Sequence, residues 1–522
     1  MNEVDIGGKV VQYTKNLPDL TVKEAEPEPL KSLGDSEKQE FCALVGEEIL
    51  NRVLEGVADA NPVEILCPAM DEKIKRTQIH QFIRENFKGI YETDSVNSQV
   101  RIWKKDSKKR PLDADDRSAR RFNKSIYLFH LYKENRDTMD VLSHMARIMK
   151  VKSSCFSFAG TKDKRAITVQ QVTSQGIDIR KLVGLSSINS SFKMSDFRPV
   201  ETMLQLGDLK GNRFSIVLRK VDTANKSEIE ASLSSLKASG FINYFGMQRF
   251  GNSSSPTHLV GKALFESKWS DAVHLILKVK DGDSEDAIRA KKIWLETQDS
   301  RMALDYLPKS MVAERQLLEF FSNHSPNDHL TALLTIKREL RLLYLHSYQS
   351  FIWNSLASAR MQFGKNPIIG DVVSKNNSVC VIENEEDLSK YQAEDIVIPL
   401  PGDSVIYPNG AFGKIVQDFL AVHWSFTPSQ YTSLKGDYRK LFAMPSDVTW
   451  RFISYKNEDD QIIPNDLNTV KEDFVEPEEG PLNALLVQFT LSVSSYATMA
   501  LREAMKLETD ASIHKSLSSN SE

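Results

Sequence analysis

The sequence predicts a mixed α/β (α+β) protein of two or three domains, and three observations support this. The chain has 522 residues, more than one hydrophobic core usually serves. Hydrophobic residues make up 41% and charged residues 26%, as in ordinary globular proteins. Short runs rich in β-branched and aromatic residues alternate with runs of helical periodicity, which is typical of mixed folds.

The first part of the chain predicts two helices and two polar segments. The helices cover 36–57 and 76–87, where apolar side chains recur at helical spacing. The proline-rich acidic stretch over 16–35 predicts a surface linker or the edge of an insertion. The stretch "WKKDSKKRPLDADDRSARRFNKS" over 103–125 carries both charges. It fits either a solvated loop or a basic patch for nuclear import or RNA-backbone contact.

After residue 123 the pattern becomes that of a mixed α/β domain. Strands are predicted over 125–133, 166–174 and 212–221, and helices over 137–150 and 226–239.

The chain then becomes mainly helical from about 256 to 364, and glycine- and proline-punctuated strands return from about 366 to 455. The last helix of this region carries four aromatic side chains: Tyr344, Tyr348, Phe351 and Trp353. At their spacing a buried core is the expected role, with a base-stacking platform as the alternative.

The net charge, the spacing of cysteines and histidines and the lengths of apolar runs limit the kinds of function expected for this protein. Lys plus Arg number 67 against 71 for Asp plus Glu, a formal charge of −4, so any RNA contact must be local. The four cysteines form no CxxC pair and the histidines no HExxH motif, so a metal-free, reducing intracellular setting is expected. No apolar run approaches the roughly 18 residues that cross a bilayer, and no secretion signal is expected.

The stretch "SFAGTKDKRAITVQQ" over 157–171 is the strongest candidate for chemistry. Asp163 stands among Lys162, Lys164 and Arg165, on a predicted loop that leads into a strand. The neighbouring cations favour the ionised carboxylate and attract a polyanion. A carboxylate in this setting can approach a ribose or base while the cations neutralise phosphates.

Other interpretations of this stretch stay open on the local pattern. An exposed ion pair on a surface loop would contribute less than about 1 kcal/mol. A phosphate-binding P-loop is excluded, because G-x-x-x-x-G-K-[ST] is absent here. An aspartyl-phosphate nucleophile is chemically conceivable, but Arg165 stands where such enzymes place a second acid.

Two more stretches indicate base recognition. "GFINYFGMQRFGN" over 240–252 sets Asn243 and Phe245 near Arg249. Aromatic faces beside amide and guanidinium groups suit an unstacked base, although two or three such aromatics would also be ordinary in a core. "SSYATMALREAMK" over 494–506 predicts a helix with Tyr496 near its start.

Six motifs together resemble the TruD family of RNA pseudouridine synthases, and in particular its eukaryotic branch, pseudouridine synthase 7. The resemblance covers nearly the whole chain. The motifs occur in the family's order: "AGTKDKRAITVQ", "GDLKGNRFSIVLRK", "NYFGMQRFG" followed by "PTHLVGKAL", "LHSYQSFIWN", "LKGDYRKL" and "SYATMALRE".

The resemblance implies isomerisation of specific uridines in RNA without a cofactor. Asp163 would be the catalytic aspartate, and Asn243, Phe245 and Tyr496 would bind the substrate, with Phe245 stacking on the flipped uracil. It also implies a catalytic domain over 1–239 and 453–522, with a helical insertion at about 20–120, and an inserted TRUD domain over 240–452.

The family's substrates and a departure from its pattern set the remaining expectations. The RNA partners implied are tRNA at position 13, precursor tRNA, small nuclear RNA and messenger RNA, acted on by a monomer in the nucleus, the cytoplasm or both.

Relatives carry a basic residue on a first strand, whereas "MNEVDIGG" begins inside that pattern at Glu3. Either the chain is a truncated product, or another cation such as Lys162 or Arg165 replaces the missing one. The missing strand also keeps open a second hypothesis, an RNA-binding homologue that has lost turnover. A scaffold protein is a third hypothesis.

Overall fold

The computed structural model describes most of the chain, in eleven stretches: 1–18, 34–58, 64–68, 73–87, 90–96, 99–104, 125–188, 191–251, 256–376, 378–424 and 434–506. The basic part of the 103–125 segment lies outside these stretches.

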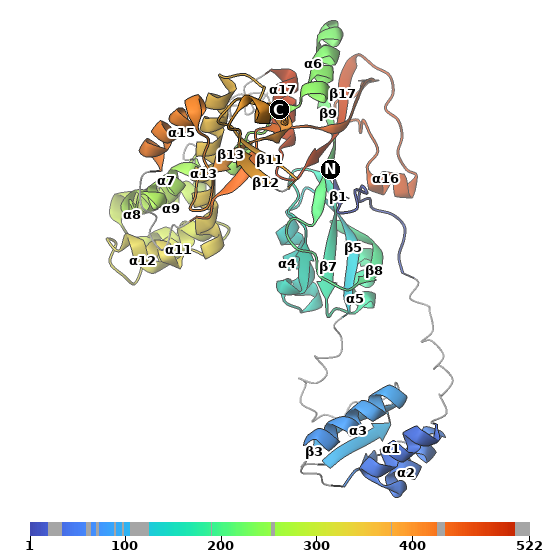
Figure 1. The fold of residues 1–522 in the computed structure, drawn as a ribbon. Helices are drawn as coiled ribbons and strands as arrows, with labels where there is room; N and C mark the ends of the chain where they lie inside the picture. Colours follow the sequence, from blue (N-terminus) through green and yellow to red (C-terminus); the bar gives the residue numbers. More distant parts are fainter. Residues whose placement is uncertain are drawn as a thin grey trace.

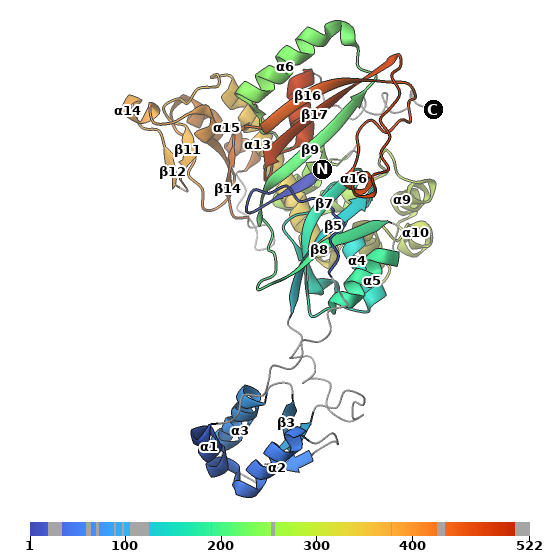
Figure 2. The ribbon, with the colours of Figure 1, turned by 90° about the vertical axis from the view of Figure 1, so that its right-hand side faces the viewer.

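A large sheet forms the centre of the molecule (Figures 1 and 2). Its order is β16-β17-β9-β1-β7-β5-β8, with β6 paired to β7. Its eight strands are β1 (Asn2–Asp5), β5 (Ile126–Glu134), β6 (Phe156–Phe158), β7 (Ile167–Gln175), β8 (Phe192–Val200), β9 (Leu209–Arg219), β16 (Ser446–Tyr455) and β17 (Leu482–Ser492). The predicted strands over 125–133, 166–174 and 212–221 are confirmed as β5, β7 and β9.

Helices pack against the sheet and form two separate hydrophobic cores with it. One core packs α4 and α5 against β5, β7 and β8, and the other packs α6 and α17 against β9 and β17. The helices of this part are α4 (Thr138–Met149), α5 (Ile179–Ile188), α6 (Lys226–Ser239), α16 (Asp466–Lys471) and α17 (Ala497–Met505). In α4, Val141, Leu142 and Met145 recur on one buried face, as helical spacing requires.

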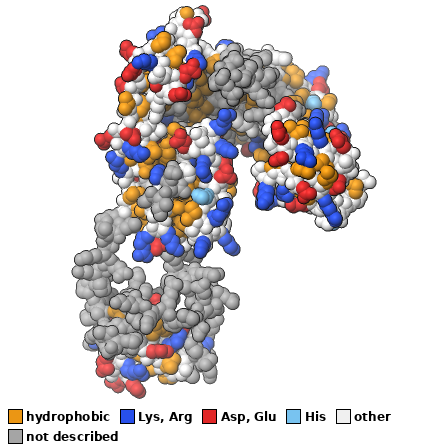
Figure 3. All heavy atoms as spheres, turned by 180° about the vertical axis from the view of Figure 1, so that it is seen from behind, with side chains coloured by type: hydrophobic (Ala, Val, Ile, Leu, Met, Phe, Trp, Pro, Cys, Tyr) orange, Lys and Arg blue, Asp and Glu red, His pale blue; other side chains and the backbone are white. Residues whose placement is uncertain are grey.

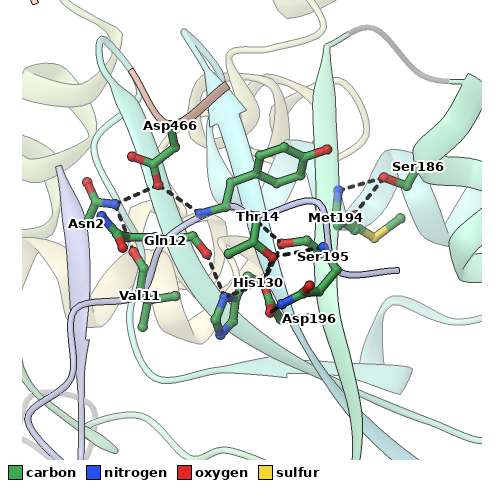
Figure 4. Close-up of polar contacts among 12 residues, drawn as sticks. Asn2, Val11, Gln12, Thr14, His130, Ser186, Met194, Ser195, Asp196 and Asp466 are labelled. Atoms are coloured by element: carbon green, nitrogen blue, oxygen red, sulfur yellow. Dashed lines mark hydrogen bonds and ion pairs between the residues drawn. The ribbon is translucent and has the colours of Figure 1, made fainter. Parts of the chain in front are cut away.

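Short strand β1 lies in the middle of the sheet, and polar contacts of the following segment secure it (Figure 4). The Asn2 amide and the Tyr13 backbone N–H both donate to the Asp466 carboxylate, at 3.0 and 2.8 Å. Further along, the Thr14 hydroxyl donates to Asp196 at 2.6 Å. These contacts hold the chain after β1 against β8 and α16.

Most of residues 257–423 form a helical part with its own core. Its helices are α7 (Thr257–Phe265), α8 (Trp269–Leu277), α9 (Glu285–Thr297), α10 (Ser300–Tyr306), α11 (Val312–Phe321), α12 (His329–Thr335), α13 (Arg338–Met361), α14 (Glu385–Leu388) and α15 (Gly410–His423). Tyr344, Tyr348 and Trp353 of α13 are buried, which confirms the expected core role, while Phe351 is half-buried.

Two smaller sheets accompany the helical part. A four-stranded sheet has the order β12-β11-β13-β14. Its strands are β11 (Val372–Lys375), β12 (Ser378–Val381), β13 (Ile396–Leu400) and β14 (Asp437–Lys440). The chain enters and leaves the helical part through a paired neck, β10 (Phe241–Ile242) antiparallel to β15 (Phe442–Ala443). Strand β16 runs unbroken across residues 452 and 453, where a domain boundary was predicted.

The remaining described elements form a small unit with a separate core. They are α1 (Asp35–Val45), α2 (Glu47–Ala58), β2 (Glu64–Leu66), α3 (Lys73–Asn86), β3 (Tyr91–Val96) and β4 (Gln99–Lys104). The single helix predicted over 36–57 is wrong, because Gly46 adopts φ +87°, a left-handed conformation that ends α1. The unit also contains a three-stranded sheet, which the sequence analysis did not predict. The prediction of a mixed α/β fold for the whole chain is confirmed.

Candidate active site

Asp163 lies in the loop between β6 and β7, and its side chain is exposed. The buried side chain of Lys133, on β5, fixes the backbone of this loop. Lys133 Nζ donates to three backbone carbonyl oxygens, those of Arg136 (2.7 Å), Asp163 (2.9 Å) and Lys162 (3.4 Å). Three acceptors match the three N–H groups of an ammonium, so the loop is best held while Lys133 is protonated.

The environment of Lys133 places its titration close to neutral pH. Burial lowers its pKa to about 8, and the negative charges of Asp137 and Asp163 act in the opposite direction. The amine is therefore mostly protonated at pH 7 and loses its charge a little above it. The Lys133 ammonium and the Asp163 carboxylate are close enough to interact electrostatically.

Lys162 turns away from Asp163 and into the protein. Its Nζ lies 2.8 Å from the Glu3 carboxylate on β1, with both side chains buried. Burial raises the pKa of Glu3, and the ion pair with Lys162 only partly opposes that rise. In the sequence Lys162 is one of three cations around Asp163, whereas in the structure it anchors the loop to β1. Lys164 and Arg165 are the exposed cations beside Asp163.

A second group of residues, which we call the ring cluster, consists of Phe245, Trp353, Arg439 and Tyr496. The guanidinium carbon of Arg439 lies 4.0 Å from the ring centre of Phe245, 5.2 Å from that of Trp353 and 5.9 Å from that of Tyr496. The rings of Phe245 and Tyr496 are 6.3 Å apart and inclined by 62°. Arg439 is therefore the centre on which three aromatic residues from distant parts of the chain converge.

Asn243 lies under the ring cluster and holds its guanidinium. Its backbone carbonyl oxygen accepts from Arg439 Nε, and its side-chain oxygen accepts from Arg439 Nη2, both at 2.9 Å. Its amide nitrogen donates to the carbonyl oxygen of Lys440 at 3.3 Å. Burial lowers the pKa of Arg439 to about 10, which leaves it cationic at neutral pH. Asn243 is itself buried and thus orients Arg439 instead of offering a free amide.

Two local features set the position of the Phe245 and Tyr496 rings. A Cβ on Gly246 would lie 3.0 Å from Cδ1 of Tyr496 and 3.2 Å from Oγ1 of Thr498, so glycine lets the segment approach the start of α17. On the other side, the Asn354 amide of α13 holds the Phe245 backbone. It accepts from the Phe245 N–H at 2.9 Å and donates to the Phe245 carbonyl at 3.1 Å.

The structure brings three of the four predicted site residues together and leaves Asp163 out of contact with them. Within the described stretches, no hydrogen bond, ion pair or ring contact joins Asp163 to Asn243, Phe245 or Tyr496. Asp163 precedes β7 and Tyr496 follows β17, and β1 and β9 lie between these strands. Viewed from behind, the molecule has a wide hollow between the sheet and the helical part, with Lys and Arg side chains on both rims (Figure 3).

Sequence reasoning missed two residues that organise the site. Arg439 belongs to "LKGDYRKL", one of the six family motifs, and nothing in the motif itself marks a role for this residue. Lys133 ends a predicted strand, where its alternation with apolar residues gave no sign of burial. An inward-facing lysine one strand away from an exposed aspartate is a signal only once strand pairing is known.

Metal and membrane features can be judged for the described residues. No cluster of three or more His, Cys, Asp or Glu side chains that could hold a metal ion occurs among them. None of the helices placed by the structure combines the length and apolar character needed to cross a membrane.

The comparisons with known proteins identify the family. The model of the family described as tRNA pseudouridine synthase D (TruD) matches residues 107–504, about three quarters of the chain. The chain belongs to the TruD family of pseudouridine synthases. Enzymes of this family isomerise uridine to pseudouridine, and the predicted enzyme class is confirmed.

Individual TruD relatives match over most of the chain. The Mus musculus protein named pseudouridylate synthase 7 homolog is 36% identical over 453 residues, which cover 84% of this chain and 68% of the relative. The Schizosaccharomyces pombe protein named multisubstrate pseudouridine synthase 7 is 35% identical over 536 residues, covering 93% and 78%. These matches do not favour the alternative of an impaired RNA-binding homologue.

A solved structure supports the same fold. A Methanosarcina mazei protein assigned to TruD superposes with a TM-score of 0.54 at 25% identity, covering 73% of this chain and 88% of that protein. The predicted TruD fold class is thereby confirmed.

Proposed function

We propose that this TruD protein converts specific uridines of RNA to pseudouridine, with Asp163 as the catalytic carboxylate. The observation that carries the proposal is the presentation of Asp163. It is exposed, its backbone is fixed by the Lys133 ammonium, and it lies in the motif "AGTKDKRAITVQ" inside the family match. A preorganised carboxylate can attack the ribose or assist departure of uracil.

The reaction needs no oxidant, reductant or second substrate. The bond between N1 of uracil and C1′ of ribose breaks, a bond between C5 and C1′ forms, and the proton on C5 leaves while N1 gains one. The base must first leave its stack, at a cost of a few kcal/mol, and stacking on an aromatic ring returns about 1 to 3 kcal/mol per base. Phe245 and Tyr496 would supply this stacking, and Arg439 would keep their rings in place.

The substrates that we propose are tRNA, at a position of the kind numbered 13, and further RNAs such as precursor tRNA, small nuclear RNA and messenger RNA. The family description names tRNA, and the Schizosaccharomyces pombe relative is named a multisubstrate enzyme. We further propose that the protein acts as a monomer in the nucleus, the cytoplasm or both.

The test compares the unaltered protein with Asp163→Asn, and with Asp418→Asn as a matched control. Asp418 is an exposed aspartate on α15. Each protein is incubated with unmodified tRNA and with a short RNA that contains uridine, and both pseudouridine formation and RNA affinity are measured. We expect Asp163→Asn to lose roughly 1000-fold or more in rate while retaining affinity, and Asp418→Asn to match the unaltered protein. Equal rates for Asp163→Asn and the unaltered protein would overturn the proposed role.

A further inference from the structure

A cavity of about 290 Å³ opens beside the ring cluster, between α13 and the start of α7. Three of its walls are rings and the others are small polar side chains. Its lining residues are Phe250, His258, Phe351, Asn354, Ser355 and Ser358. Its volume lies at the lower limit of pockets that hold small ligands, which start at about 300 Å³. One planar group fits such a space better than a larger ligand does.

His258 gives this cavity a polar group without a partner. Its ring stacks on Phe351, with centres 4.6 Å apart and planes inclined by 1°, and the Phe250 ring is perpendicular to it, with centres 5.4 Å apart. Its Nδ1 is buried and has no hydrogen-bond partner among the described residues. Burial lowers the pKa of His258, so the ring is neutral at pH 7. A buried nitrogen without a partner is uncommon in a folded protein, and a base that reaches it after the His258 ring turns would supply the missing hydrogen bond.

The cavity shares its wall with the ring cluster. Asn354 lines the cavity and also holds the Phe245 backbone at 2.9 and 3.1 Å. Ser358 lines it too, and its hydroxyl is 2.9 Å from that of Tyr244. The wall is rigid because α7 and α13 touch closely: a Cβ on Gly261 would lie 2.0 Å from the carbonyl oxygen of Tyr344.

Arg249 lies close to both the ring cluster and the rings that line the cavity. Its guanidinium carbon is 6.0 Å from the Phe245 ring centre, and the next residue, Phe250, lines the cavity. Its Nε donates to the Ser350 hydroxyl at 3.2 Å. Within the described part of the chain no hydrogen bond or ion pair is made by its two Nη atoms, which are therefore available to a phosphate.

We propose that this cavity binds one nucleobase of the RNA, belonging to a nucleotide that flanks the target uridine. The inference rests on the proposed function, which makes RNA the substrate. The rings supply apolar contact to a planar base, His258 Nδ1 supplies one hydrogen bond to a base edge once the ring turns toward it, and Arg249 meets the backbone between the two nucleotides. The target base and one neighbour are thus recognised at two sites joined through Asn354.

The experiment measures affinity in the Asp163→Asn background, so that turnover plays no part. The probe is a short fluorescent single-stranded RNA with one uridine, together with a set of copies in which each neighbouring nucleotide in turn lacks its base. Ser355→Leu fills the cavity, and His258→Phe keeps the stack on Phe351 while removing Nδ1. Ser235→Leu, at an exposed position of α6, is the matched control.

We expect loss of the base at one flanking position to weaken binding roughly tenfold. This tenfold weakening of binding should disappear in Ser355→Leu, shrink to about threefold in His258→Phe, and persist in Ser235→Leu. Variants are compared only where the thermal midpoint of unfolding is unchanged, and His258→Phe serves if Ser355→Leu does not fold. A penalty of equal size in the parent and both cavity variants, or no penalty at any position, overturns the proposal.

Pseudouridine formation by the protein that retains Asp163 is measured in parallel. If removing a flanking base weakens binding only while the cavity is intact, but no pseudouridine forms, the base site is supported and the proposed function is refuted. If pseudouridine forms but the effect of removing a flanking base does not depend on the cavity, only the base site is refuted.

Discussion

The Asp163 loop and the ring cluster are built in opposite ways. The loop is one continuous motif, held from inside by two buried lysines, Lys133 and Lys162, that bind backbone carbonyls and a carboxylate. The ring cluster draws single residues from three distant segments around the buried Arg439 guanidinium. A group that reacts needs an exact position and an exposed tip, whereas a surface that receives a base needs broad, rigid faces.

After the loss of Asp163 itself, the largest effect is expected from Arg439, the one cation on which the ring cluster depends. Arg439→Met leaves both oxygens of Asn243 without their donor and removes the support of the Phe245 ring. We expect the rate of pseudouridine formation to fall roughly 100-fold, because buried acceptors that lose a charged donor are costly. Arg439→Lys should recover only part of it, since an ammonium cannot reproduce the planar fork.

Arg338→Met, at the exposed start of α13, is the control for this change and should behave like the unaltered protein. A rate for Arg439→Met within twofold of the control, in a folded protein, would show that Arg439 does not organise the site.

Removing a stacking face should have the next largest effect. Phe245→Ala is expected to lower kcat/KM roughly 30-fold, because a ring that stacks on a base contributes about 1 to 3 kcal/mol. Steady-state kinetics on a single tRNA measures this, and Phe245→Tyr should retain most of the activity. Phe363→Ala, at an exposed ring beyond α13, provides the comparison. If both alanine variants lose the same amount, Phe245 has no special place in substrate recognition.

The pH dependence distinguishes the loop from the ring cluster. The pKa of Lys133 is about 8 in the folded protein and 10.5 ordinarily. Above pH 8 the amine loses one N–H, so one carbonyl contact of the loop fails, and we expect the rate to fall by about tenfold in total between pH 7 and 10. Stability should move the other way: between pH 8 and 10.5 the unfolded chain binds more protons, so the contribution of Lys133 to the free energy of unfolding rises with pH.

Lys133→Met should be about tenfold slower at pH 7 and should lack the fall above pH 8. Rates and thermal midpoints measured from pH 6 to 10 test both parts. The charged groups around Lys133 are Asp137, Asp163 and Lys162, and Asp137→Asn should shift the fall to lower pH. Should Lys133→Met keep the same alkaline fall, another group is responsible for it.

The smallest effect is expected from the exposed cations. Lys164→Ala should weaken RNA binding by about threefold at low salt, and the difference should shrink as salt rises, because phosphate contacts depend on counterion release. The rate at saturating RNA should not change. Binding titrations at two salt concentrations test this expectation. A loss of RNA affinity that is independent of salt would mean that Lys164 acts through the loop structure.

The sequence was sufficient for most of the fold and for part of the site. Strands β5, β7 and β9 follow from short runs rich in β-branched and aromatic residues, and helix α6 follows from the helical spacing of its apolar residues. Asp163 could be found because its motif is continuous. The role of Lys133 could not, since the same spacing fits a surface lysine at a strand end. Arg439 is one of 67 Lys and Arg residues, and only the pairing of β10 with β15, the strand that follows Arg439, brings it beside Asn243.

The break at Gly46 and the inward turn of Lys162 were missed for a related reason. Helical periodicity continues through both sides of Gly46, and only the left-handed conformation at that residue shows that α1 and α2 are separate. Lys162 has the same chemistry as Lys164, but the strand β1, which is about 160 residues away in sequence, gives it a buried carboxylate partner. Contacts of this range leave no local pattern.

The paired neck of β10 and β15 has a consequence for how this architecture can change over time. Because the chain departs and returns through two adjacent strands, the whole segment between Asn243 and Leu441 could lengthen, shorten or be exchanged while the large sheet keeps its connections. Yet Phe245 and Arg439 sit at the two ends of that exchangeable segment, directly beside the neck. Selection can therefore remodel the helices remote from the neck, whereas Phe245, Arg439 and the Trp353 ring of α13 restrict what can change in the rest of the segment.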